Sequence, residues 1–168
     1  MLKEKIYSSI NDFEFMNKII FKKRIEILSI IKRIIDLKMI NSCLDIGTTN
    51  DFNKKSSNLI IKNLNEINIS KSISTQKIDF PFFNIILTKS IIDNFSNDEI
   101  SKMSSDLVIS SATIEHVGNE KNQIKMINNI IKLSKKYLVI TTPNRLFPID
   151  FHTKIPLIHW FPKNLHRF

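Results

Sequence analysis

The feature that most constrains this chain is a regular alternation between short apolar segments and amphipathic helical stretches. Apolar residues spaced three and four apart predict helices, whereas short apolar runs bounded by turn residues predict buried strands. Helices are expected over residues 12–40, 55–66, 96–104 and 119–135, and strands over residues 42–47, 67–74, 84–92, 106–110 and 137–141. Strands that alternate with helices pair in parallel. The chain is therefore predicted to be an α/β protein with a doubly wound, mostly parallel sheet of about five strands.

A length of 168 residues fits one domain and leaves no room for two. We expect an N-terminal helical segment over residues 1–40, a core over residues 41–142 and a tail over residues 143–168. In parallel α/β sheets, ligand sites lie at the carboxyl ends of the strands. The core is therefore the part of the chain expected to carry the functional site.

The net charge of +9 raises the question of a nucleic-acid partner. Only four of the 25 basic residues are Arg, the residue that forms bidentate contacts with phosphates and bases. The lysines are dispersed, with no run longer than two. Since Lys and Asn have A/T-rich codons, genome composition accounts for the charge, and no nucleic-acid partner is expected.

No segment of the sequence indicates a membrane or a secretory route. The first residues lack an apolar signal region, and no stretch approaches the roughly 18 apolar residues of a membrane helix. The chain is expected to be cytoplasmic, without a membrane partner. The lone Cys43 excludes a disulfide framework, and His152, His159 and His166 lack the companions of a metal site.

Two strand ends carry the residue types of a ligand site. The first is Asp45-Ile46-Gly47, an acid that closes a strand before a glycine turn, where the backbone can approach a ligand closely. The second runs from Asp106 through Ser110-Ser111 to Glu115-His116-Val117. No G-x-G-x-x-G pattern is present, which disfavours a dinucleotide-dependent oxidoreductase.

In the order and spacing of these two motifs, the chain resembles the class I S-adenosylmethionine-dependent methyltransferases of the bacterial small-molecule type. The resemblance extends from about residue 40 to residue 168. It implies a Rossmann-like fold, S-adenosyl-L-methionine as the cofactor and methyl transfer to a small-molecule acceptor. A methyltransferase acting on nucleic acid is disfavoured, because Ser110-Ser111-Ala112-Thr113 replaces the Asn/Asp-Pro-Pro-aromatic segment of those enzymes.

The resemblance also implies roles for individual residues. The loop after the first strand would hold the amino-acid end of the cofactor, Asp93 and Asn94 would contact its adenine, and Ser110 and Ser111 would line its methionine portion. His116 would lie on the substrate side and is the candidate general base. The cofactor-binding residues are thus expected to be Asp45, Gly47, Thr48, Thr49, Asp93, Asn94, Ser110 and Ser111, and no metal ligand is expected.

The chain departs from the family pattern in two places. No acid follows the second strand to bind the ribose hydroxyls, which leaves Thr75 or Gln76 for that contact. The usual C-terminal strand hairpin also lacks a counterpart, so the fifth strand is expected to have an uncovered edge that the tail covers or that self-associates. The alternative hypothesis is therefore a truncated or degenerate relative that is inactive, or that acts only with a partner.

Overall fold

The computed structural model describes residues 14–52 and 54–143. One compact unit, Lys23–Thr142, contains the whole sheet, and residues 1–22 and 143–168 make up the other unit. The sheet has five strands in the order β3-β2-β1-β4-β5, and every neighbouring pair is parallel. The strands are β1 (Ser42–Ile46), β2 (Ile69–Ser74), β3 (Ile85–Thr88), β4 (Ser105–Ser111) and β5 (Ser134–Thr141).

The strand order makes the fold doubly wound and Rossmann-like. From β1 the chain winds outward through β2 to β3, and it then crosses back to β4 and winds outward to β5. Ligands of such sheets bind where the winding reverses, at the carboxyl ends of the strands. The reversal lies between β1 and β4, where Ile46 pairs with Ser110. The fold class predicted from the sequence is confirmed.

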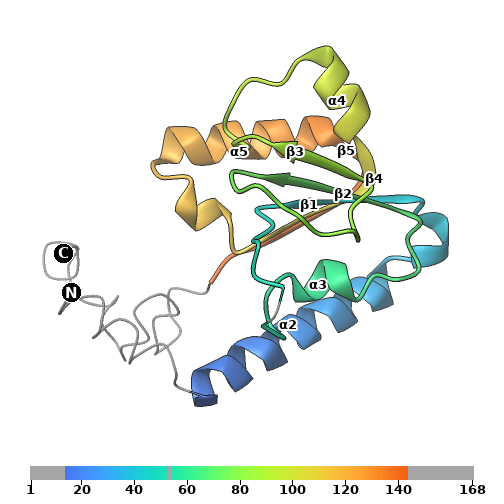
Figure 1. The fold of residues 1–168 in the computed structure, drawn as a ribbon, viewed down its shortest axis with the longest axis vertical. Helices are drawn as coiled ribbons and strands as arrows, with labels where there is room; N and C mark the ends of the chain where they lie inside the picture. Colours follow the sequence, from blue (N-terminus) through green and yellow to red (C-terminus); the bar gives the residue numbers. More distant parts are fainter. Residues whose placement is uncertain (1–13, 53, 144–168) are drawn as a thin grey trace, which may run out of the picture. The chain divides into compact units, whose positions relative to one another are not determined.

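Helices cover both faces of this sheet (Figure 1). On one face, α2 (Glu14–Ile34) supplies Leu28 and Ile31, and α3 (Leu59–Lys62) supplies Leu59, to a core that includes Leu107 of β4. On the other face, α4 (Asn97–Met103) and α5 (Glu120–Leu133) pack over Leu44, Ile46, Ile73 and Val108. Side chains alternate between the faces along each strand, so neighbouring strand residues enter different cores.

Local hydrogen bonds explain where the expected helices are shorter. The first helix ends at Ile34, because Asp36 caps a separate 3-10 turn, η1 (Leu37–Met39), by accepting from Lys38 N. The helix expected over residues 55–66 is reduced to α3, preceded by Asn58 in the left-handed conformation. The strand expected over residues 84–92 ends at Thr88, since the Ser90–Asp93 turn follows it.

The outer strand β5 presents apolar side chains to its surroundings. Tyr137 and Leu138 are 41% and 37% exposed. The expectation that the tail covers this strand concerns residues that lie outside the described part of the chain. Among the described residues, no helix is both long and apolar enough to cross a bilayer.

Candidate functional site at the carboxyl ends of β1 and β4

The sheet divides the predicted site residues between its two faces. Asp45 pairs in register with Ile109, whose face packs against α2 and α3, whereas Ser110 pairs with Ile46, whose face packs against α4 and α5. Residues paired between parallel strands share a face. Asp45 and Ser110 therefore point to opposite sides of the sheet, and a ligand contacting Ser110 on its face does not meet the Asp45 carboxylate there.

The Asp45 carboxylate is engaged inside the protein. Its side chain is buried and accepts a hydrogen bond of 2.5 Å from Thr48 Oγ1, which in turn accepts one of 2.8 Å from Ser72 Oγ. Burial raises the pKa of Asp45 to about 6, against the lowering effects of the Thr48 hydrogen bond and the Arg24 charge. Asp45 and Thr48 thus hold the turn after β1 onto β2, which is a structural role.

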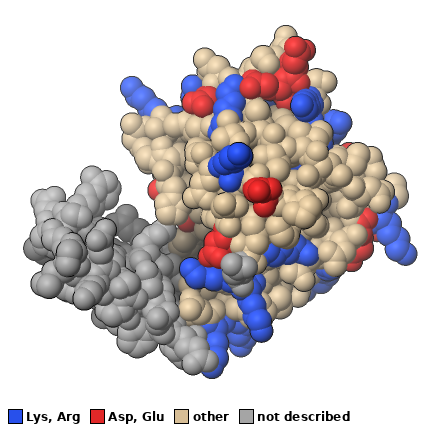
Figure 2. Space-filling model, in the orientation of Figure 1, with Lys and Arg blue, Asp and Glu red and all other residues tan. Residues whose placement is uncertain are grey.

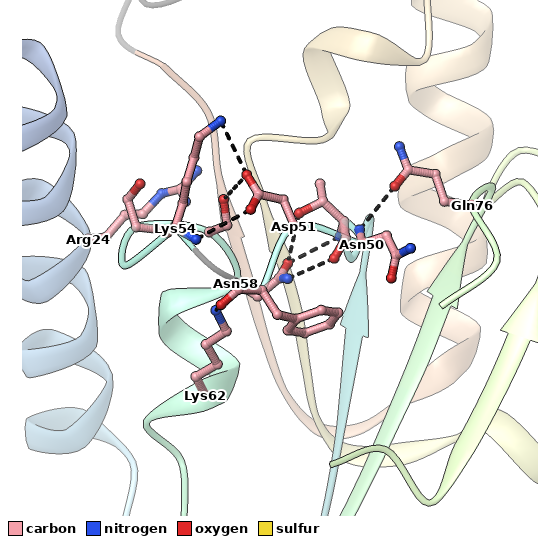
Figure 3. A network of polar contacts seen from close by, with 11 residues as sticks. Arg24, Asn50, Asp51, Lys54, Asn58, Lys62 and Gln76 are labelled. Atoms are coloured by element: carbon pink, nitrogen blue, oxygen red, sulfur yellow. Dashed lines mark hydrogen bonds and ion pairs between the residues drawn. The ribbon is translucent and has the colours of Figure 1, made fainter. Parts of the chain in front are cut away.

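Polar contacts also brace the loop between β1 and α3 (Figure 3). Asn58 accepts from Thr49 N at 3.1 Å and donates to Thr49 O at 2.8 Å. Asp51 forms an ion pair with Lys54 at 3.3 Å. The Arg24 guanidinium donates to the carbonyl oxygen of Ser56 and ties this loop to α2. The loop is therefore held by its own side chains, and the groups of Thr49 that were expected to face a cofactor bind Asn58 instead.

The polar side chains at the end of β2 are likewise hydrogen-bonded within the protein. Ser74 Oγ donates to Thr48 O at 2.7 Å, and Gln76 Oε1 accepts from Asn50 N at 3.0 Å. Gln76, one of two residues expected to replace the missing ribose-binding acid, thus uses its carbonyl oxygen to fix the neighbouring loop (Figure 3). Thr75 is exposed at this position.

The loop after β3 carries Asp93 and Asn94, both exposed. Asp93 Oδ2 accepts from Ser90 N at 3.2 Å, and the buried Asn129 amide of α5 donates to the carbonyl oxygens of Ile91 and Asp93. Asn94 lines a hollow of about 230 Å³ between α4 and α5, with Phe95, Ile100, Asn129, Lys132 and Leu133. None of the expected cofactor-binding residues Asp45, Gly47, Asp93 and Ser110 lines this hollow.

The end of β4 has a different character, because polar atoms there are buried without partners. Ser110 is 0% exposed and its Oγ makes no hydrogen bond, and Glu115 Oε1 is equally unpaired. These are the two unpaired buried side-chain polar atoms among the described residues, and they lie five positions apart. Buried polar atoms in native proteins are nearly always hydrogen-bonded. The end of β4 is therefore where the described chain offers polar groups to a ligand.

The segment after β4 crosses toward β1. Ala112 has a φ of 54°, and the following 3-10 turn η2 (Ile114–His116) carries Glu115 and the exposed His116. Thr113 Oγ1 donates to Ile46 O at 3.0 Å, at the end of β1. Ser111 Oγ accepts from Thr141 Oγ1 at 3.1 Å and so joins the ends of β4 and β5.

Gly47, which follows β1, is in contact with this segment. Its φ is 86°, a conformation that favours glycine. A Cβ atom at Gly47 would lie 2.3 Å from Thr113 Oγ1 and 2.7 Å from Thr113 Cγ2. The absence of a side chain at Gly47 thus admits Thr113, a residue that sequence reasoning did not select, because nothing in the sequence predicts a left-handed Ala112.

Comparisons with known proteins add two structural similarities. No protein-family model matches the chain, and no curated protein matches its sequence. Two solved structures of the N-methyltransferase NodS from Bradyrhizobium japonicum WM9 are similar in fold. The complex with S-adenosyl-L-homocysteine has a TM-score of 0.46 and 12% identity, over 77% of this chain and 68% of that chain. The second NodS structure has a TM-score of 0.42 and 13% identity, over 68% and 63% of the two chains.

Proposed function

We propose that this chain binds S-adenosylmethionine at the carboxyl ends of β1 and β4 and transfers its methyl group to a small-molecule acceptor. The observation that carries the proposal is the unpaired, fully buried Ser110 hydroxyl beside the point where the winding reverses. The motif order that resembles class I methyltransferases supports the same cofactor. The binding site would lie in the described core, whereas methyl transfer is proposed for the whole protein.

The residues at this edge fit the cofactor in chemistry and in part of their placement. Ser110 would offer its hydroxyl to the methionine portion, Gly47 would allow close backbone approach, and the exposed Asp93 and Asn94 would meet the adenine. Thr48, Thr49 and Asp45 would act indirectly, by fixing the turn after β1. Without a charged ribose ligand, binding is expected to be weak, since a charge-assisted hydrogen bond is about twice as strong as a neutral one.

When bound, S-adenosylmethionine supplies a methyl group already activated by the sulfonium charge. The protein then has to align the acceptor and exclude water. The exposed His116, whose backbone N donates to Thr113 O at 3.0 Å within η2, is the proposed base for an acceptor that must lose a proton. We expect His116→Asn to lower the turnover of such an acceptor about 100-fold. Its affinity for S-adenosylhomocysteine should match that of the wild type.

A small-molecule acceptor also agrees with the surface charge. On the face shown in Figure 2, Lys and Arg side chains are scattered and interspersed with Asp and Glu. A nucleic-acid site is typically a continuous basic patch or stripe. We therefore propose no nucleic-acid partner. The cytoplasm stays the proposed compartment.

Calorimetric titration of the full chain with S-adenosylhomocysteine tests the proposed function, with NAD as the control ligand. We expect a saturable heat for S-adenosylhomocysteine and none for NAD. No heat with S-adenosylhomocysteine at millimolar concentration would overturn the proposal. Saturable heat without methyl transfer to amine, hydroxyl or thiol compounds would favour the alternative, a non-catalytic relative, which the occupation of the Gly47 surface by Thr113 also favours.

A further inference from the structure

Thr113 occupies the surface of Gly47 that a ligand would need. Its Oγ1 and Cγ2 lie within 2.3 Å and 2.7 Å of the place of a Gly47 Cβ, so the two residues are in direct van der Waals contact. The Thr113 hydroxyl is bound to the main chain of β1, at Ile46 O. The turn after β1 is therefore covered at Gly47 by one of the protein's own side chains.

The conformation that delivers Thr113 is a costly one. Ala112 adopts a φ of 54°, in the left-handed region that is unfavourable for a residue with a Cβ. A hydrogen bond from Ala112 N to Thr141 O, 2.9 Å long, holds it in place. The closed arrangement thus combines a favourable Thr113 contact with an unfavourable Ala112 backbone, and these two terms oppose each other.

The same segment packs on the face of the sheet that carries Ser110, whose buried hydroxyl is unpaired. Ser110 shares its face of the sheet with Ile46, and Ile114 and Val117 pack, partly buried, on the core cluster to which Ile46 belongs. Opening of residues 112–117 would clear Gly47, and because the segment packs on the face that carries Ser110, we expect the same movement to expose Ser110.

We propose that residues 112–117 form a lid that is closed in this structure, with Thr113 as the group that a ligand must displace from Gly47. The proposal rests on the proposed function for the identity of the ligand, S-adenosylmethionine, whereas the lid itself is a property of the chain. Binding then requires the open state, and any change that weakens the closed state increases the observed affinity.

A thiol at position 110 reports on the lid without any ligand. In Ser110→Cys, reaction with a thiol reagent should be slow, because the lid covers the side chain. The native Cys43 is fully buried, and burial raises the pKa of its thiol, so its background reaction is low. Adding Thr113→Ala should accelerate labelling about fivefold, the equivalent of one ordinary hydrogen bond.

Two further variants complete the test. One is a control, and the other should change the labelling rate in the opposite direction. Thr88→Ala removes an exposed hydroxyl at the end of β3, which β2 and β1 separate from β4 and the lid, so labelling should be unchanged. Ala112→Gly removes the left-handed cost of the closed state and should slow labelling about twofold or more. Equal labelling rates in the Thr113→Ala, Ala112→Gly and parent backgrounds would overturn the lid.

Titration with S-adenosylhomocysteine separates the lid from the proposed function. With both correct, Thr113→Ala should bind about fivefold more tightly than the wild type and Ala112→Gly about twofold more weakly. Labelling that follows the predicted order, without any titration heat, would leave the lid standing and reject the function. Titration heat with the same affinity in all three proteins would support the function and reject the lid.

Discussion

Each end of β4 carries a fully buried serine, but only the serine at the amino end has a hydrogen-bond partner. At the amino end, Ser105 Oγ donates to Met103 O at 3.1 Å, and Asp106 accepts from the main chain of Asn41 and Ser42 and lies 3.4 Å from the Lys136 ammonium. At the carboxyl end, Ser110 is just as buried and its hydroxyl has no partner. The buried serine at the start of the strand is thus hydrogen-bonded, and the buried serine near its end is not.

This difference distinguishes polar groups that are bonded within the protein from polar groups that are available to a ligand. At the amino end, the buried Lys71 is also hydrogen-bonded, because its ammonium donates to the carbonyl oxygens of Lys102 and Ser104 at 2.8 Å each. Such bonds satisfy the carbonyl groups left free where α4 ends. At the carboxyl end, the left-handed Ala112 adds strain to missing hydrogen bonds. Strain and unpaired polar atoms concentrate at functional sites.

The largest expected contrast concerns the two acids, Asp45 near the carboxyl end of β1 and Asp106 at the amino end of β4. The Asp45 pKa rises from 3.8 to about 6. The folded state therefore binds a proton more tightly than the unfolded state. The stabilisation is complete below pH 3.8 and is lost as the pH rises through 6. Across that range it amounts to about 3 kcal/mol. In urea titrations from pH 4 to pH 8, Asp45→Asn should lack this decline in the free energy of unfolding.

Asp106 should show the reverse dependence. Burial acts to raise its pKa, but the hydrogen bond from Asn41 N and the Lys136 ammonium outweigh burial and hold the pKa below the usual value. Its stabilisation is therefore present above the usual Asp pKa and is lost as the pH falls through the lowered one. Asp106→Asn should cost about 1 kcal/mol at pH 7. Equal pH profiles for the two Asn variants would contradict the contrast.

The next contrast compares the two glycines, both of which have positive φ values. Gly47 has a φ of 86° with Thr113 against it, whereas a Cβ at Gly118, φ 98°, would meet only Asn122 Nδ2 at 3.4 Å. Gly118→Ala should lose about 1 kcal/mol of unfolding free energy from backbone strain. Gly47→Ala should lose about 2 kcal/mol, because it also displaces Thr113. Chemical denaturation measures both, and equal losses would show that Thr113 leaves Gly47 at no cost.

The strands of the sheet could be predicted from the sequence because each is marked by a pattern of neighbouring residues. Apolar runs such as residues 106–110 are bounded by turn residues, and all five expected strands occur in the expected order along the chain. At the start of the helix expected over residues 96–104, Ser96 and Glu99 form a capping box, a pattern that is local in the sequence. Local signals were weaker near α3. There Asn58 has a left-handed backbone and its side-chain amide donates to Thr49 O, so the helix does not include it.

The site was less predictable, because its geometry depends on contacts between distant segments. The sequence places Asp45 and Ser110 at strand ends, but only the register between β1 and β4 assigns them to opposite faces. The position of Thr113 depends on a left-handed Ala112, a conformation that its side chain does not favour. Residue type alone therefore indicates the edge of the sheet that matters and leaves out the side chain that closes it.

The most direct test of the account replaces the two buried serines of β4 and measures both stability and ligand binding. Ser105→Ala should lose about 1 kcal/mol of unfolding free energy and keep the wild-type affinity for S-adenosylhomocysteine, because it removes a satisfied structural hydrogen bond. Ser110→Ala should keep wild-type stability and bind S-adenosylhomocysteine about fivefold more weakly. The opposite pattern, with Ser110→Ala destabilised and its affinity unchanged, would contradict the assignment of the carboxyl end of β4 to ligand binding.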